Sequence, residues 1–114
     1  MEQEVAFRQG LALIGRGCFF EAHEELERAW RAAEPAERDF LQGLVHVAVA
    51  WYQAGRGRPV ATASQLEKAA RRLGPYAPAH RGVDVAGVLA QVEKARAVVA
   101  AGSLELEPPH LPAK

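Results

Sequence analysis

Glycine and proline divide the chain into five segments, each long enough for a helix of several turns. Helices end where glycine frees the backbone, and they do not continue through proline, so these residues mark the element boundaries. The segments run over residues 2–14, 19–33, 35–53, 59–73 and 84–102. Alanine and arginine, both strong helix formers, are abundant, and β-branched residues other than valine are scarce. The sequence therefore predicts an all-α fold.

Apolar residues recur at helical spacing and indicate how the segments pack. In 35–53 they cover well over a third of the helix surface, which is typical of a central helix. The remaining stripe of that helix carries Asp39, Gln42, His46 and Gln53. An offset of 40 residues also superimposes 15–35 on 55–75. We expect stacked helical hairpins, a short superhelical array, closed by the fifth helix. A tetratricopeptide protein, with a repeat of about 34 residues, is the alternative.

We expect residues 1–102 to form a single all-helical domain, because a chain of 114 residues suits one core. Residues 103–114 are rich in proline and are expected to form a short tail, extended or disordered. The single cysteine excludes an intrachain disulfide, no stretch is apolar enough for a membrane helix, and the acidic start is unlike a signal peptide. These features predict a cytoplasmic protein with no membrane partner. The lack of asparagine fits a thermophilic source, or equally a GC-rich genome.

The strongest candidate for a functional site is the segment EAHEELERAW, residues 21–30. His23 and Glu27 are one helical turn apart, so their side chains leave the same face, close to Trp30. They can form a semi-buried network between the second and third helices, with Arg38 reaching Glu27 across the hairpin. The alternative is a polar pocket for a ligand between these helices. Its candidate residues are His23, Glu24, Glu27, Trp30, Arg38, Gln42 and His46.

A third interpretation is a metal site in which His23 and Glu27 bind the ion and Glu24 acts as the base of a hydrolase. The segment resembles the zinc-protease motif HExxH, but its second histidine is missing. No serine-hydrolase, P-loop, dinucleotide or zinc-ribbon motif occurs, and Cys18 is expected to be a small core residue rather than a nucleophile. We therefore expect no cofactor, and no catalytic motif is complete enough to assign an enzyme activity.

The formal net charge is zero, but the charges are segregated along the chain. Residues 1–55 carry a net charge of −4 and residues 56–114 a net charge of +4. The candidate basic patch comprises Arg56, Arg58, Lys68, Arg71, Arg72 and Arg81. Arg71 and Arg72, near the end of the fourth helix, can complement its dipole, and the alternative is that the patch binds phosphate or RNA. The neutral total and the lack of interleaved aromatic residues argue against nucleic acid as the partner.

A homodimer with two-fold symmetry, or a complex with another protein, is expected from the apolar surface. The third helix is apolar over more of its surface than the other helices are expected to cover, and Phe19 and Phe20 also need cover. The acidic and basic halves would complement each other across a two-fold axis. The alternative is a monomer in which the fifth helix and the tail cover the same surface.

Several strings in the sequence resemble the family known as domain of unknown function 309. They are GCFFEAHEELERAW, RDFLQGLVHVAVAWYQ, QLEKAARRL, YAP and GVD, within residues 7–84. The resemblance implies a small, mostly prokaryotic, all-helical protein with no established activity. Its family-defining positions here are Phe20, Glu21, His23, Glu24, Glu27, Trp30, Arg38, Gln42, Gly43, Gly82 and Asp84. The chain departs from the family at His46, where glutamine is expected, and at Gly57–Arg58, where Gly-Asn is expected.

The residues thus favour a binding or scaffold module with a polar pocket between the second and third helices. Metal-assisted hydrolysis is the first alternative, and phosphate or RNA binding by the basic second half is the second.

Overall fold

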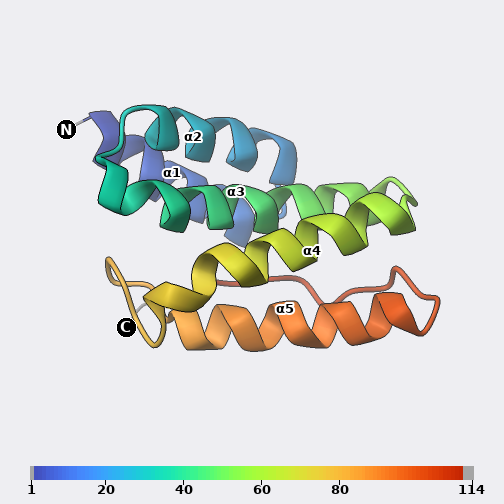
Figure 1. The fold of residues 1–114 in the computed structure, drawn as a ribbon. Coiled ribbons are helices and arrows are strands. Elements are labelled where there is room, and N and C mark those ends of the chain that lie inside the picture. The colour runs from blue at the N-terminus through green and yellow to red at the C-terminus, as the bar shows by residue number, and fades with distance from the viewer. Residues whose placement is uncertain (1, 112–114) are drawn as a thin grey trace.

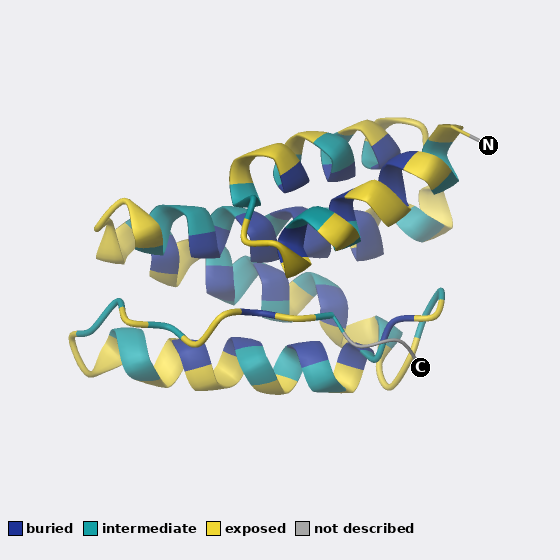
Figure 2. Ribbon diagram, turned by 180° about the vertical axis from the view of Figure 1, so that it is seen from behind, coloured by how far each residue is buried: buried dark blue, intermediate teal, exposed yellow. Residues whose placement is uncertain are grey.

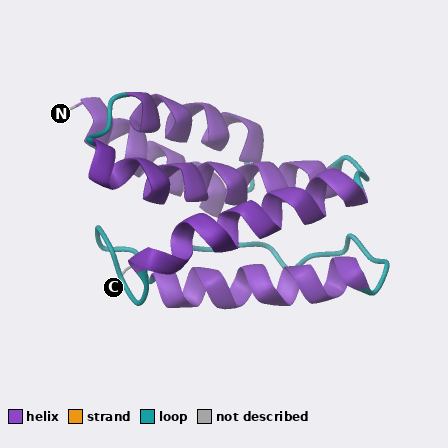
Figure 3. Ribbon diagram, in the orientation of Figure 1, coloured by secondary structure: helices purple, strands orange, loops and turns teal. Residues whose placement is uncertain are grey.

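The computed structural model describes residues 2–111, and all the α-helices and the one 3₁₀ helix in this range are shown in Figures 1 and 3. They are α1 (Glu2–Gly15), α2 (Phe19–Arg31), α3 (Pro35–Gly55), α4 (Pro59–Leu73), the 3₁₀ helix η1 (Gly74–Tyr76) and α5 (Val85–Ala100). The predicted all-α fold is confirmed. The ends of the five α-helices differ from the predicted ends by no more than two residues.

Three of the helices end in the same glycine-based cap. The glycine that follows each helix has a positive φ angle, of 78° at Gly17, 73° at Gly57 and 94° at Gly102. The next amide donates to a carbonyl five residues earlier, as Cys18 does to Leu13 at 2.9 Å. This pattern is a Schellman motif, which requires a backbone conformation that glycine adopts without steric penalty. Because the caps after α1 and α3 match, the pairs α1–α2 and α3–α4 are two hairpins that turn in the same way.

Helix α3 lies at the centre, with α2 packed against one flank and α4 against the other (Figure 1). Its buried residues are Phe40, Leu41, Gly43, Leu44, Val45, Val47, Ala48, Ala50 and Trp51. The buried residues of α2 and α5 lie on the sides turned toward the interior, and their outer sides are exposed (Figure 2). One core therefore joins both hairpins, and α3 is the element that they share.

Helix α5 packs against α4, and the segment after it folds back along α5 (Figures 1 and 2). Residues 103–111 have no regular secondary structure, but they are held by specific contacts. The indole Nε1 of Trp51 donates to the carbonyl of Glu107 at 2.9 Å, and the amide of His110 donates to Oε1 of Gln91 at 2.9 Å. Pro109 is buried. The segment thus covers part of α3, whereas residues 112–114 of the predicted tail lie outside the described range.

Gly43 allows α3 and α4 to approach each other closely. A Cβ atom at this position would lie 2.7 Å from both Cγ and Cδ2 of Leu73. Leu73 is fully buried, so its side chain has no free space to move into. We expect Gly43→Ala to lower the free energy of unfolding by about 1–3 kcal/mol, because the helices must separate to admit the methyl group. Urea denaturation measures this change.

Gly55→Ala is the matched control in the same helix. A Cβ atom at Gly55 would meet no heavy atom within 4 Å. Alanine favours the helix over glycine by up to about 1 kcal/mol, so this variant should be unchanged or slightly more stable. Equal destabilisation by both substitutions would contradict the steric explanation.

Candidate functional site

His23 and Glu27 lie one turn apart on α2, where the sequence predicts them. His23 Nδ1 lies 2.7 Å from the carbonyl oxygen of Phe20 and donates to it, while Nε2 lies 3.8 Å from Oε2 of Glu27. Oε1 of Glu27 also lies 3.6 Å from the guanidinium of Arg31. Both ion-pair distances exceed those of strong charge-assisted hydrogen bonds, and the Glu27 side chain is 40% exposed. Such surface pairs contribute about 0–1 kcal/mol.

Arg38 has a different neighbour from the one expected. Instead of reaching Glu27, its guanidinium carbon lies 4.7 Å from the centre of the Trp30 ring, a cation–π contact between α2 and α3. The indole Nε1 of Trp30 is buried and has no hydrogen-bond acceptor among residues 2–111. Glu24 is exposed. The structure therefore brings Trp30 and Arg38 together, and leaves Glu24 apart from them on the outer surface of α2.

His46 faces α4 and not α2. Its Nδ1 lies 2.7 Å from Oε1 of Gln65 and donates to it. One helical heptad earlier on α3, Asp39 accepts a hydrogen bond from Arg72 of α4 at 2.8 Å. These two cross-links fix the antiparallel register of α3 and α4. The residues of the predicted pocket are thus divided between the α2–α3 interface and the α3–α4 interface. Gln65, which bonds to His46, was not among the predicted pocket residues.

Burial lowers the pKa of His46 below the usual histidine value of 6.5. The hydrogen bond with Gln65 opposes this shift in pKa, and the positive charges of Arg72, Lys68 and Arg71 on α4 add to it. His46 is therefore neutral at pH 7. With Nδ1–H donating to Gln65, Nε2 of His46 is an acceptor, and this buried atom meets no donor in the part of the chain that the structure describes.

The lowered pKa of His46 makes folding stability depend on pH. Below about pH 6.5 the histidine becomes protonated in the unfolded chain, whereas burial keeps it neutral in the folded protein. Protonation therefore favours the unfolded state. The stability that neutral His46 contributes above pH 6.5 is lost as the pH falls toward its folded-state pKa. We expect the urea midpoint to fall less between about pH 7.5 and 5.5 in His46→Gln than in the wild type. The same substitution at exposed His110 is the control. An identical pH dependence in wild type and His46→Gln would contradict the buried neutral imidazole.

Unsatisfied polar atoms concentrate on the stripe of α3 that lies between α2 and α4. Among the described residues, five buried side-chain atoms have no hydrogen-bond partner, and four of them belong to this surface. They are Nε1 of Trp30, Nε2 of His46, Oε1 of Gln53 and Nε of Arg72. The fifth, Nη1 of Arg81, lies 3.6 Å from Glu37 and so has an ion-pair partner.

We call this surface the polar row. It comprises Trp30 of α2, Arg38, Gln42, His46 and Gln53 of α3, and Gln65, Lys68 and Arg72 of α4. A cavity of about 160 Å³ adjoins the row where Gln53 lies, and His23 and Tyr52 also line it. The row therefore contains residues of the predicted polar pocket on both flanks of α3. It also contains Lys68 and Arg72 of the predicted basic patch.

The basic patch is dispersed in the structure. Arg56 and Arg58 lie in the turn that precedes α4, whereas Lys68, Arg71 and Arg72 lie in its last turns. The two groups are separated by about 20 Å along the helix axis. Arg71 and Arg72 already pair with Glu67 and Asp39. Arg81 is in the connector before α5, where its side chain is only 17% exposed. The six residues do not form one continuous basic surface.

A second ionic cluster, which was not predicted, ties the connector to α1 and α3. Nε2 of His80 lies 2.9 Å from both carboxylate oxygens of Glu37. Arg81 donates to Glu4 at 2.6 Å, and its guanidinium carbon lies 4.3 Å from the centre of the Phe7 ring. The hydrogen bond from Arg81 lowers the pKa of Glu4. The cluster links the first turns of α1 and α3 to a residue 77 positions after Glu4.

The turn at 80–83 gives this cluster its geometry. His80 and Val83 exchange two backbone hydrogen bonds, of 3.1 and 2.9 Å, around the central residues Arg81 and Gly82. Both central residues have positive φ angles, 50° and 77°, as in the tight turns of β-hairpins. Positive φ is uncommon for arginine, so the ion pair and the contact with Phe7 help to hold it there.

Within residues 2–111, no group of three or more His, Cys, Asp or Glu side chains is arranged to hold a metal ion. His23 and Glu27 have no third ligand of these types beside them. None of the described helices has the length and apolar character needed to cross a membrane.

Residues 7–64 match a family model described as "Domain of unknown function (DUF309)". The match covers α2, α3 and most of α1, and so includes the α2 and α3 residues of the polar row. No curated protein matches the sequence.

Proposed function

The chain belongs to this family of unknown function, and we propose that it is a binding module whose polar row takes an extended, acidic segment of a partner protein. The observation that carries the proposal is the set of four buried, unpartnered polar atoms on one surface. Each such atom is unfavourable by about 1–3 kcal/mol unless something bonds to it. Native proteins keep few of them, so four on one surface point to a bound group.

The chemistry of the four atoms supports a peptide as the ligand. Trp30 Nε1 and Arg72 Nε are donors, whereas Gln53 Oε1 and the Nε2 of neutral His46 are acceptors. A polypeptide backbone offers both kinds of group at every residue. From Asp39, beside Arg72, to Gln53 the helix rises about 21 Å, which equals about six residues of extended chain.

The charges along the row support an acidic segment. Arg38 lies one turn before Gln42 on α3, and Lys68 lies on α4 close enough for its charge to act on His46. Neither Arg38 nor Lys68 has a carboxylate partner among residues 2–111. Arg72 adds a third positive charge, although Asp39 pairs with it at 2.8 Å. A segment with glutamate or aspartate side chains would supply the missing counter-charges.

The two tryptophan side chains allow a direct test with nitrogen-15 labelled protein. We expect blocked hexaglutamate, up to about 1 mM and at low salt, to shift the indole N–H signal of Trp30 in a saturable way. The indole of Trp51 already donates to Glu107 at 2.9 Å, so its signal should stay in place as an internal control. Blocked hexalysine should shift neither signal.

Two variants locate the binding surface. Lys68→Gln removes one positive charge from the row and should weaken hexaglutamate binding about two- to fivefold. Arg8→Gln also removes one positive charge, but Arg8 is 76% exposed on α1, away from the row, so binding should be unchanged. No shift of the Trp30 signal, or equal weakening by both variants, would contradict the proposal.

A further inference from the structure

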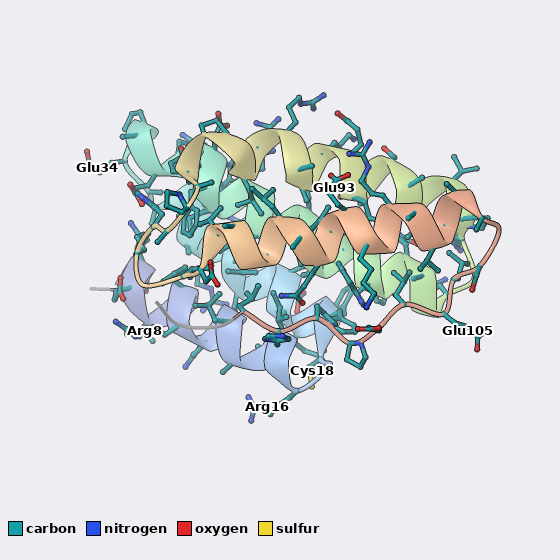
Figure 4. All side chains as sticks on the ribbon, turned by 90° about the horizontal axis from the view of Figure 1, so that it is seen from below. Arg8, Arg16, Cys18, Glu34, Glu93 and Glu105 are labelled. Carbon is teal, nitrogen blue, oxygen red and sulfur yellow. The ribbon has the colours of Figure 1, made fainter. Side chains whose placement is uncertain are left out.

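An aromatic notch lies where α3 extends beyond the start of α2 (Figure 1). It is a cavity of about 370 Å³ between the α1–α2 turn and the last turns of α3. We use the name aromatic notch for the surface lined by Cys18, Phe20, Glu21, Trp51, Tyr52 and Arg56. Figure 4 shows Cys18 at the turn between α1 and α2, and Arg16 in the same turn points away from the helices into solvent.

The notch exposes an ordered aromatic pair. Phe20 is 46% exposed and is the one aromatic residue among the exposed large hydrophobic side chains in the described chain. Its ring centre lies 5.5 Å from that of Tyr52. Arg56 donates to the hydroxyl of Tyr52 at 3.0 Å and lies 5.5 Å from the ring centre. Tyr52 is therefore held between Phe20 and Arg56, and Phe20 faces solvent although burial of its ring would be favourable.

The charges around this pair are arranged by sign. Glu21 and Glu24 are exposed on α2, and Arg56 and Arg58 are exposed in the turn after α3. None of the four forms an ion pair within residues 2–111, although most other charged side chains of the protein do. Of these four, Glu21 on α2 and Arg56 after α3 line the notch itself, so it carries one unpaired acid and one unpaired base from different elements.

We propose that the aromatic notch binds the same notch of a second copy of this chain, across a two-fold axis. A two-fold axis places the same patch of both copies face to face. If residue i of one copy contacts residue j of the other, then residue j of the first copy also contacts residue i of the second. The acids on α2 of each copy then face Arg56 and Arg58 of its partner, and the Phe20 rings are buried between them. Aromatic and arginine side chains are enriched at such interfaces.

The alternative is that the chain's own C-terminal segment covers the apolar surface, and at the notch it covers Trp51 alone. That segment contacts Trp51 through Glu107 and leaves Phe20 exposed. The notch alone is small for a permanent interface, so the dimer should dissociate at low concentration. The notch and the polar row share no residue, although Phe20 and Tyr52 also line the cavity beside Gln53. Lys68 belongs to the row alone and Glu21 to the notch alone, so their variants test the two proposals separately.

Light scattering on the full chain tests the dimer. At low salt we expect the mass to rise from near 12.3 kDa toward twice that value as the concentration increases from about 10 to 300 µM. Phe20→Ala should abolish this rise. Val5→Ala is the control, because Val5 is an apolar side chain on α1 that is 52% exposed. A mass of one chain at both concentrations, or a dimer that persists in Phe20→Ala, would overturn the proposal.

Charge reversal tests the two-fold geometry. Glu21→Arg alone or Arg56→Glu alone places like charges against each other in both halves of the interface, and should weaken the dimer at least about tenfold. An equimolar mixture of the two variants restores opposite charges in both halves, so a dimer of mixed composition should form. Circular dichroism checks that each variant is folded. If the mixture stays monomeric while both variants are folded, the two-fold pairing is wrong.

Discussion

The burial of α3 between α2 and α4 is the packing interaction on which the rest of the structure depends. Because both flanks of α3 are covered, only a narrow stripe of it remains, and this stripe carries Gln42, His46 and Gln53. Gly43 lets α4 approach closely at Leu73, and farther along the same pair of helices Gln65 of α4 bonds to His46. The polar row is therefore a product of the two hairpins, since no single helix supplies its donors and acceptors.

Much of this architecture follows from local signals in the sequence. Glycine and proline end the helices, and their physical effect on the backbone does not depend on tertiary contacts. The three Schellman caps at Gly17, Gly57 and Gly102 show this directly. The apolar width of α3 was also sufficient to predict its central position, because a helix that apolar must be covered on several sides.

The orientation of the polar side chains was harder to predict from the sequence. Helical spacing places Asp39 and His46 on one stripe of α3, but it does not say whether that stripe turns toward α2 or α4. The answer depends on how the second hairpin folds over the first, which is a property of the whole core. The same reason explains why Arg38 was assigned to Glu27, whereas it stacks on Trp30. The hydrogen bond between Glu4 and Arg81 spans 77 residues, and no local sequence pattern predicts it.

The polar row joins the two hairpins, and this arrangement separates two explanations for its unpartnered atoms. A buried water molecule makes about three hydrogen bonds, so it would satisfy one such atom and its nearest neighbours without spanning both flanks of α3. A ligand that accepts from Trp30 of α2 and from Arg72 of α4 would instead connect helices that belong to different hairpins. Its binding energy would then add to the stability of the whole fold, since it binds the folded state only. Because the four atoms are covered in the unbound protein, such a ligand would reach them only after the side chains above them move aside.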